Sequence, residues 1–285
     1  MVRGTYGLMK VDAWTLKDRK LEKLWRWSNE RAPFKFQGQG QHSVKVGDVD
    51  GDGCDEILNG TIAIDNDGRT MWGTGNGHGD RFYLTDVDPG HPGLEVFSIH
   101  EDPQPRDGLT LVDARTGRVL WGLDEPSRDN QLSEALVGDI DAAHPGMECW
   151  ASAGEGLFFT ARGERIAGDV PPASFLAYWN ADLLREVVYP GGRRAGGTRI
   201  GKWQGATLTS GIEGWLLQIA DVVGDWREEL VTFTEGELRI HSTTIPASDR
   251  RPCLMQDPIY RHDVTHRSMG YPHTPQLSFY LGPRP

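Results

Sequence analysis

Short apolar runs follow acidic, glycine-rich segments at several places along this chain. In VGDVDGDGCDEIL (46–58), carboxylates alternate with glycine and an apolar pair follows directly. Similar segments begin at Asp86, Asp139 and Asp221, and each reaches a glutamate eight or nine residues later, where an apolar run starts. We call these four segments the Asp loops. Each is predicted to lead into a short β-strand.

A pattern typical of a β-hairpin follows three of the Asp loops. The sequences are AIDNDGRTMW (63–72), LVDARTGRVLW (111–121) and FFTARGERI (158–166). Their turns, DNDG, RTG and RG, place glycine where a positive φ is needed, and the alternating residues on either side predict the two strands. An Asp loop, a strand and a hairpin together form an antiparallel unit of about 40 to 50 residues, the repeat length of a β-propeller blade.

The repetition predicts an all-β fold, with residues 1–285 forming a single β-propeller of four-stranded antiparallel blades. The four Asp loops and the long interval before the last one give about five blades. Such a chain is expected to form a smaller or open propeller, or to be one part of a larger protein. Residues 168–214 are rich in proline and glycine and are expected to form an irregular insertion or an extra blade. As an insertion, they would be a surface excursion or a loop that faces the substrate.

The acidic residues of the first Asp loop indicate a calcium site. Five carboxylates within residues 48–56 repel one another, so a cation that neutralises them would favour folding of the loop. Oxygen ligands at alternate positions, separated by glycines, match the way Ca²⁺ is held in Asp-rich loops. The alternative is an Asp/Gly-rich turn without metal. The predicted ligands in the first three Asp loops are Asp48, Asp50, Asp52, Asp55, Asp86, Asp88, Glu95, Asp139, Asp141 and Glu148.

Composition limits the classes of partner. The chain has 285 residues with 30 basic and 41 acidic side chains, a formal net charge of −11. This charge argues against nucleic acid or an anionic membrane as the main partner. No apolar run approaches the ~18 residues of a transmembrane helix, and the first residues lack the apolar core of a signal peptide. The three cysteines form neither a disulfide framework nor a CxxC metal pair.

A second candidate metal site lies outside the Asp loops. His42 and His78 each precede an Asp loop at similar places, Asp80 follows in HGD, and Glu101 ends the strand in IHE. If the repeats are blades, these four side chains could converge, and two imidazoles with two carboxylates would make a plausible metal site. The alternative is that the histidines are structural and hydrogen-bonded. We prefer that alternative for the two histidines of the HPG turns.

Five motifs, in chain order, resemble the family 11 polysaccharide lyases, the rhamnogalacturonan lyases. They are GQGQHSVKVGDVDGDGCDEI, GNGHGDRFYLTDVDPGHPGLEVFSIHE, GDIDAAHPGMECWAS, GDWREELV and TTIPASDRRPCLMQDPIYR with SFYLG. The resemblance implies an eight-bladed, Ca²⁺-rich β-propeller of which this chain is the C-terminal half to two-thirds. It also implies cleavage of the rhamnose–galacturonic acid backbone of pectin by β-elimination, with rhamnogalacturonan I or its oligosaccharides as partner. Family members are secreted or cytoplasmic, so the resemblance leaves localisation open.

The resemblance also assigns roles to individual residues. It implies that His42, His78, Asp80 and Glu101 hold a Ca²⁺ near the substrate, and that Tyr271 corresponds to an active-site tyrosine. β-Elimination removes the proton next to a uronate carboxylate, so a cation bound to that carboxylate would stabilise the developing negative charge. A base and a proton donor would complete the reaction.

Two departures from the family pattern bear on activity. Glu134 stands where the family has an arginine, and Glu213 stands in a segment where it has a lysine. Three hypotheses follow. The first is a rhamnogalacturonan lyase, with activity weak or lost, or a close relative that acts on another uronic acid polymer. The second is a non-catalytic carbohydrate-binding propeller stabilised by calcium, and the third is an adhesion module like the FG-GAP propellers. In the first, Arg185, Arg199 or Lys202 could supply the missing positive charge. The HGD and IHE motifs favour the lyase family over the adhesion module.

Overall fold

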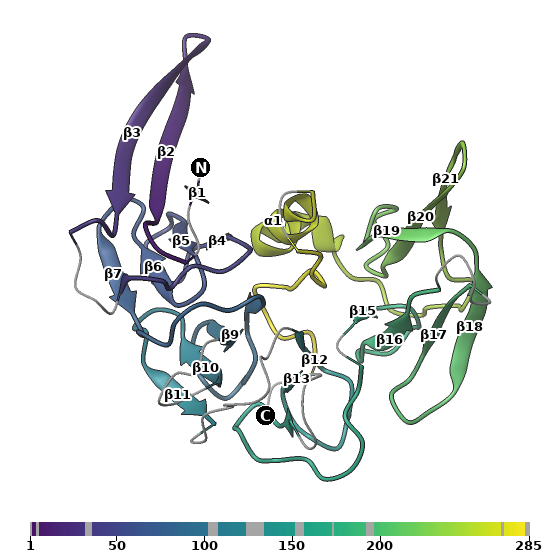
Figure 1. The fold of residues 1–285 in the computed structure, drawn as a ribbon. Helices are drawn as coiled ribbons and strands as arrows, with labels where there is room; N and C mark the ends of the chain where they lie inside the picture. The colour runs from purple at the N-terminus through teal and green to yellow at the C-terminus, as the bar shows by residue number, and fades with distance from the viewer. Residues whose placement is uncertain are drawn as a thin grey trace. The chain divides into compact units, whose positions relative to one another are not determined.

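The computed structural model of the chain separates into two compact units (Figure 1). The first unit contains Met1–Leu84 and Gly93–Ser133, and the second contains Thr85–Pro92 and Glu134–Pro285. The structure describes residues 2–3, 6–31, 36–101, 108–123, 134–151, 157–172, 174–191, 197–268 and 271–282.

The first unit contains three antiparallel sheets within its described residues. One sheet has the order β1-β2-β3, the next β4-β5-β6-β7, and the third β11-β10-β9-β8, whose strand β8 ends at the unit boundary. The strands are β1 (Val2–Arg3), β2 (Lys10–Lys17), β3 (Lys20–Ser28), β4 (Lys45–Gly47), β5 (Glu56–Leu58), β6 (Ile62–Ile64), β7 (Thr70–Gly73), β8 (Phe82–Thr85), β9 (Glu95–Ile99), β10 (Leu109–Asp113) and β11 (Val119–Gly122).

The second unit also contains three antiparallel sheets within its described residues, with the orders β12-β13-β14, β15-β16-β17-β18 and β19-β20-β21. Its elements are β12 (Ala135–Gly138), β13 (Glu148–Ala151), β14 (Phe158–Phe159), β15 (Phe175–Ala177), β16 (Glu186–Tyr189), β17 (Thr198–Gly201), β18 (Thr207–Ile212), β19 (Trp215–Ala220), β20 (Glu229–Thr234), β21 (Glu237–His241), the 3₁₀ helix η2 (Leu254–Gln256) and the helix α1 (Pro258–His266). The all-β prediction is confirmed, since in the described part of the chain one α-helix of nine residues accompanies these sheets.

The hairpin turns have the backbone conformation that the sequence predicts. Gly68, Gly117 and Gly163 adopt φ values of +87°, +73° and +80°. These values lie in the left-handed region, which glycine occupies without the steric cost that a Cβ atom brings. The predicted hairpins that contain the first two turns are β6–β7 and β10–β11, and both pair antiparallel.

Tryptophans link neighbouring sheets of the first unit. Trp25 of β3 donates a 2.7 Å hydrogen bond from its indole nitrogen to the carbonyl oxygen of Asn66, in the β6–β7 turn. In the same way Trp72 of β7 donates a 2.8 Å bond to the carbonyl oxygen of Ala114, in the β10–β11 turn. The glycines of these turns lie so close to the indole rings that an added Cβ atom would be 2.8 Å and 2.6 Å from a ring carbon. The repeated tryptophan therefore packs each sheet onto the turn of the next.

Within residues 168–214, for which the sequence predicts an irregular insertion or an extra blade, the described residues form regular β-structure. The described part of this segment holds the four-stranded sheet β15-β16-β17-β18. Its apolar face includes Ala177, Val188 and Ile200, which pack with Ile219 and Leu230 of the following sheet. The described residues contain six antiparallel sheets, where the sequence predicts about five blades; the sheet that follows neither an Asp loop nor the long interval is β1-β2-β3.

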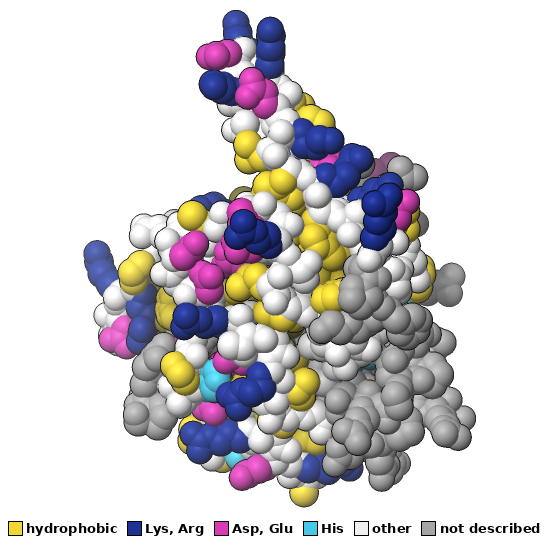
Figure 2. Space-filling model, turned by 90° about the vertical axis from the view of Figure 1, so that its left-hand side faces the viewer, with side chains coloured by type: hydrophobic (Ala, Val, Ile, Leu, Met, Phe, Trp, Pro, Cys, Tyr) yellow, Lys and Arg dark blue, Asp and Glu magenta, His cyan; other side chains and the backbone are white. Residues whose placement is uncertain are grey.

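The β2–β3 hairpin is the longest pair of strands in the first unit (Figure 1). Lysine, arginine and acidic side chains gather at its turn (Figure 2), where the sequence is LKDRKLE. Trp14, Leu16, Leu21 and Leu24 are exposed along the same hairpin. No helix within the described residues is long and apolar enough to cross a membrane.

Candidate functional site

Two groups of side chains in the first unit could each hold a metal ion. One group is His42, His78 and Asp80, and the other is Asp48, Asp50 and Glu56. Within each group, one ligand atom per residue lies within 4.8 Å of the others. In the part of the chain that the structure describes, these are the groups of three or more that meet this condition.

Two segments that run side by side build the histidine group. Gln41 and Gly79 form a parallel bridge, so the residues that flank them, His42 and Asp80 among them, lie next to one another. Gly79 has no room for a side chain, because a Cβ atom there would lie 1.8 Å from the carbonyl oxygen of Ile99. Glycine at this position therefore lets the 78–80 segment pack against the end of β9.

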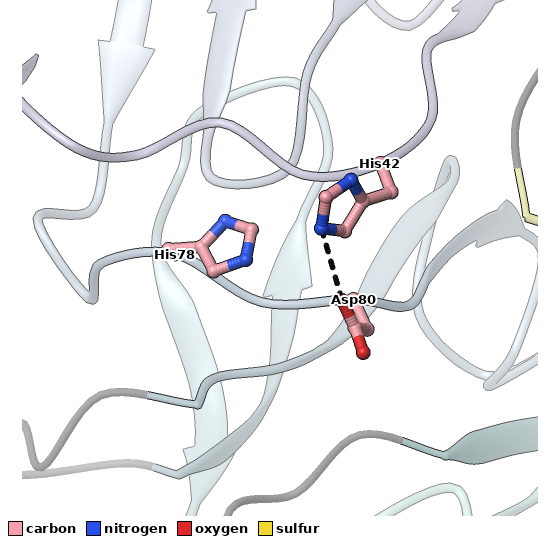
Figure 3. A group of neighbouring side chains, drawn as sticks. All are labelled: His42, His78 and Asp80. Atoms are coloured by element: carbon pink, nitrogen blue, oxygen red, sulfur yellow. Dashed lines mark ion pairs between the residues drawn. The ribbon is translucent and has the colours of Figure 1, made fainter. Parts of the chain in front are cut away.

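The predicted site residues of this group are brought together in pairs. His42 Nε2 lies 3.2 Å from Asp80 Oδ1 (Figure 3). His78 Nε2 lies 3.4 Å from Glu101 Oε2, and the two imidazole rings are 5.1 Å apart between centroids. Glu101 thus adjoins the group through His78, although it is not one of the three residues within 4.8 Å of each other.

The environment of His78 fixes which ring nitrogen carries the proton. His78 is buried, and its Nδ1 lies 2.5 Å from the carbonyl oxygen of Gly40. A carbonyl only accepts hydrogen bonds, so Nδ1 must carry the proton, and in the neutral ring Nε2 then presents its lone pair on the side of Glu101. Metal-bound histidines commonly donate their second N–H to a carbonyl in this way. The donor set and its orientation therefore fit a cation.

One tyrosine contacts the histidine group, and it is not the tyrosine that the sequence predicts to be catalytic. Tyr6, which the sequence analysis did not single out, has its hydroxyl 3.4 Å from His42 Nε2 and its ring 4.2 Å from that of His78, between centroids. No local motif marks Tyr6, since the contact joins residues 36 positions apart. Tyr271, the predicted catalytic residue, belongs to the second unit and is 40% exposed.

The first Asp loop folds through hydrogen bonds from its backbone to its own carboxylates. Asp48 accepts from the N–H groups of Gly51 and Gly53, at 2.8 and 3.0 Å, and Asp50 Oδ1 accepts from Asp52 at 3.1 Å. The glycines have positive φ, so the chain can turn back over the carboxylates.

Glu56 closes this loop from inside the protein. It is fully buried, and its Oε2 accepts a 2.9 Å hydrogen bond from the backbone of Val49. Its Oε1 is buried without a hydrogen bond to the described residues. Burial raises the pKa of Glu56, and the neighbouring aspartates add to this, while the Val49 hydrogen bond opposes it. A buried carboxylate oxygen among acidic neighbours fits a cation that neutralises them.

The remaining predicted ligands of the first loop lie outside this group. Asp52 Oδ1 accepts a 2.7 Å hydrogen bond from the backbone of Cys54, and its Oδ2 lies 3.3 Å from Asn66 Nδ2. Asp55 is exposed to solvent. The structure thus brings Asp48, Asp50 and Glu56 together and leaves Asp52 and Asp55 at the periphery.

The third Asp loop repeats the buried glutamate of the first. Glu148 Oε2 accepts hydrogen bonds from the backbone of Ile140 and Asp141, at 2.9 and 3.1 Å, and its Oε1 is buried without a hydrogen bond to the described residues. Burial raises the pKa of Glu148 to about 9. Burial also raises the pKa of Asp139 to about 6, although the hydroxyl of Tyr280 donates to it at 2.6 Å. Asp139, Asp141 and Glu148 do not form a group whose ligand atoms all lie within 4.8 Å of one another.

The second Asp loop contacts an arginine. Asp88 Oδ2 accepts from Arg162 Nε at 3.2 Å, and Asp88 Oδ1 accepts from the backbone of Gly90 at 2.9 Å. Asp86 Oδ2 accepts a 3.1 Å bond from the backbone of Tyr280, and Glu95 is fully buried. This loop therefore has a guanidinium next to one of its predicted calcium ligands.

A fifth loop of the same kind, residues 178–186, was missed in the sequence analysis. Its closing glutamate, Glu186, is fully buried and accepts backbone hydrogen bonds from Trp179 and Asn180, at 2.7 and 3.2 Å. Asparagine and tyrosine replace two of the acids here, so the run of aspartates that marks the other loops is absent. The spacing of Asn180, Asp182 and Glu186 equals that of Asp50, Asp52 and Glu56 and could have identified it.

Comparison with known proteins relates the whole chain to one family. The family model described as "Rhamnogalacturonan lyase family 11, C-terminal domain" matches residues 1–284. Two Bacillus subtilis proteins are similar over 99% of this chain: rhamnogalacturonan endolyase YesW, at 40% identity, and rhamnogalacturonan exolyase YesX, at 36% identity.

Solved structures agree with this relation. The crystal structure of rhamnogalacturonan lyase YesW has a TM-score of 0.86 at 40% identity, and that of the exotype lyase YesX has 0.88 at 35% identity. Each alignment includes 99% of this chain. It includes 49% of the YesW chain and 50% of the YesX chain. The chain also covers only 46% and 50% of the two curated relatives, so it spans about half their length.

Proposed function

We propose that this chain, which belongs to the C-terminal domain family of the family 11 rhamnogalacturonan lyases, takes part in the cleavage of rhamnogalacturonan by β-elimination. The observation that carries the proposal is the family match over residues 1–284, together with the convergence of His42, His78 and Asp80. The family match also favours this function over an adhesion module of the FG-GAP kind.

The histidine group is the proposed site for a catalytic cation. His42, His78 and Asp80 would hold it, with Glu101 next to His78, and Ca²⁺ is the ion that the family resemblance implies. When bound, the cation supplies charge neutralisation for the carboxylate of a galacturonate. Gly40 keeps the proton of His78 on Nδ1, so that Nε2 is oriented as a ligand. Asp80 positions the His42 ring through their 3.2 Å contact.

The family resemblance implies that Tyr271 is an active-site tyrosine, and we propose that it takes part in the elimination. The side chain is 40% exposed, so a polysaccharide could reach it.

The Asp loops are proposed to bind calcium that stabilises the fold. The first loop has the best-formed ligand group. Weaker sites are proposed at Asp86/Asp88 and Asp139/Asp141 from the sequence repeat alone. We further propose that the antiparallel sheets are blades of a single β-propeller. The sequence repeat, the family resemblance and the tryptophans that pack one sheet onto the next turn support this arrangement.

Release of unsaturated uronate, measured by absorbance near 235 nm with rhamnogalacturonan I as substrate, tests the proposed activity. Activity that EDTA abolishes and calcium restores is expected. His78→Ala should lose activity and the associated metal, whereas the control His144→Ala, in an HPG turn, should retain both. Activity that resists EDTA and His78→Ala would contradict the proposed role of this site.

A second candidate is a protein that binds the polysaccharide without cleaving it. The acids at 134 and 213 favour this candidate because they would repel a galacturonate. Two of the cations considered as replacements are engaged in other contacts: Arg185 is buried 3.4 Å from Glu228, and Lys202 lies 2.6 Å from Asp182 and Glu186. Retention of the protein on immobilised rhamnogalacturonan, without product at 235 nm, would support this second function.

A further inference from the structure

The fifth loop has the local conformation of the first Asp loop. Asn180 Oδ1 accepts a 2.8 Å hydrogen bond from the backbone of Asp182, as Asp50 Oδ1 accepts one of 3.1 Å from Asp52. Each loop ends in a buried glutamate whose Oε2 accepts hydrogen bonds from the backbone of the loop. The two loops are therefore versions of one structural unit, although one lies in each compact unit.

The fifth loop has fewer acidic groups than the first. Tyr178 and Asn180 stand where the first loop has Asp48 and Asp50. The carboxylates of Asp182 and Glu186 remain. A loop with two carboxylates in place of five needs less positive charge to be neutralised, and a divalent ion would have fewer anionic ligands.

A lysine ammonium group contacts both remaining carboxylates of the fifth loop. Lys202 Nζ lies 2.6 Å from Asp182 Oδ1 and 2.6 Å from Glu186 Oε1. Lys202 is 20% exposed, and Glu186 is fully buried. The oxygen it reaches, Oε1, is the counterpart of the Glu56 oxygen that is buried without a hydrogen bond. In Glu186 this oxygen likewise accepts no hydrogen bond from the described residues, and its contact with Lys202 is an ion pair.

Lys202 replaces an acid at the matching position of the hairpin turn. It begins the β17–β18 turn, where its N–H donates to the carbonyl oxygen of Ala206 at 3.0 Å. Asp65 begins the β6–β7 turn in the same way, and its backbone N–H donates to the carbonyl oxygen of Arg69 at 2.8 Å. The fifth loop has thus exchanged an anionic side chain at this turn for a cationic one.

We infer that the ammonium group of Lys202 is the resident cation of the fifth loop and takes the place that Ca²⁺ is proposed to take in the first. The loop then folds without metal, since a short ion pair with a buried carboxylate supplies the charge that Glu186 needs. The inference rests on the proposed calcium binding of the first Asp loop. The inference further implies that substitution of Lys202 leaves a binding site for another cation.

Hydrogen exchange measured by mass spectrometry, with calcium and with EDTA, tests whether the two loops differ. EDTA should speed amide exchange in residues 48–56 by about tenfold or more and leave that of residues 178–186 within about twofold. If exchange speeds up in both loops, the inference about Lys202 is overturned. If it speeds up in neither, the calcium proposal for the first loop fails, and the Lys202 variants below decide the inference.

Two substitutions of Lys202 test the cation role directly. Lys202→Met should speed exchange in residues 178–186 by about tenfold or more, with or without calcium, because Glu186 loses its partner. In EDTA, amide exchange in residues 178–186 should be as fast in Lys202→Asp as in Lys202→Met. In calcium, exchange in Lys202→Asp should slow again, and elemental analysis should find one more Ca²⁺ per chain. Lys20→Met, at the exposed β2–β3 turn, is the matched control and should behave as the unmodified protein.

Either of two results would overturn the inference. Lys202→Met could exchange as slowly as the unmodified chain in residues 178–186, which would mean that the ammonium does not stabilise the loop. Lys202→Asp could bind no additional calcium at millimolar concentration while its circular dichroism shows that it is folded. That result would mean that this position is not a cation-binding site.

Discussion

The hydroxyl of Tyr260 donates a 2.6 Å hydrogen bond to Oε1 of Glu228, and both side chains are fully buried. The other carboxylate oxygen of Glu228 accepts from the backbone of Tyr178 at 2.8 Å and lies 3.4 Å from Arg185 Nη1. Burial raises the pKa of Tyr260 well above its usual value, and the adjacent carboxylate adds to this. This buried network connects α1 with the segments that flank β15 and β20.

Removal of the Tyr260 hydroxyl should destabilise the protein while the fold is retained. Tyr260→Phe leaves Glu228 Oε1 buried without its donor, at a cost of about 1.5–3 kcal/mol in the free energy of unfolding. Urea unfolding followed by fluorescence measures this cost. Tyr189→Phe is the matched control, since the Tyr189 ring that Arg199 stacks on is preserved and a change of less than about 0.5 kcal/mol is expected. Equal stability of the two variants would show that the buried hydrogen bond is not stabilising.

Chelation of metal should lower the melting temperature. If Ca²⁺ binds the first Asp loop in the native state and not in the unfolded state, its removal lowers the free energy of unfolding. The loss is about 2.7 kcal/mol relative to a calcium concentration 100 times the dissociation constant. Differential scanning calorimetry with calcium and with EDTA measures the shift. Glu56→Gln should reduce the shift because it removes a charge from the ligand group, whereas Glu22→Gln, on the exposed β2–β3 hairpin, should not. A melt that EDTA does not change, in protein free of metal by elemental analysis, would refute calcium binding here.

A methyl group at position 79 should disrupt the histidine group. In Gly79→Ala the new Cβ atom would lie 1.8 Å from the carbonyl oxygen of Ile99, so the 78–80 segment has to move. We expect a loss of about 1–3 kcal/mol of stability and loss of the metal that depends on His78. Gly7→Ala is the matched control, because a Cβ atom there meets no atom within 4 Å. Stability and metal content measured together separate the two effects, and an unchanged metal content in Gly79→Ala would place the metal elsewhere.

Local features of this fold could be predicted from the sequence. The hairpin turns were predictable because a glycine with positive φ is a property of a few adjacent residues, and Gly68 and Gly117 have it. The first Asp loop was predictable in part for the same reason, since Asp48 and Asp50 lie close in sequence. Glu56, which was not among the predicted ligands, completes the group in place of Asp52 and Asp55. The N-terminus of α1 also has a local signal that was not used, an Asp257 cap followed by proline.

Features that depend on strand register could not be derived in this way. Lys202 meets Asp182 and Glu186 only because β16 and β17 pair in one register and the turn then returns to the loop. The fifth loop lacks the acids that marked the others, so the sequence left open whether residues 168–214 form an irregular insertion or an extra blade. Tyr6 likewise reaches His42 through tertiary packing alone. The convergence of His42, His78 and Asp80 was predictable only through the assumed repeat and the family resemblance.

Reversal of two charges should raise the elimination activity. Glu134→Arg together with Glu213→Lys would restore the positive charges that the family pattern has, and we expect an increase of about tenfold or more in the initial rate at 235 nm. The structure adds a second effect at 213, because Glu213 now lies 2.7 Å from Arg239, which the substitution would release. Glu22→Arg with Glu235→Lys changes the net charge equally at two exposed positions and is the control for general attraction of an acidic polymer.

If the control variant raises the initial rate as much, the effect is one of net charge. If the unmodified chain already cleaves rapidly, the acids at 134 and 213 do not impair catalysis and the charge comes from other residues, of which Arg199 is the remaining candidate.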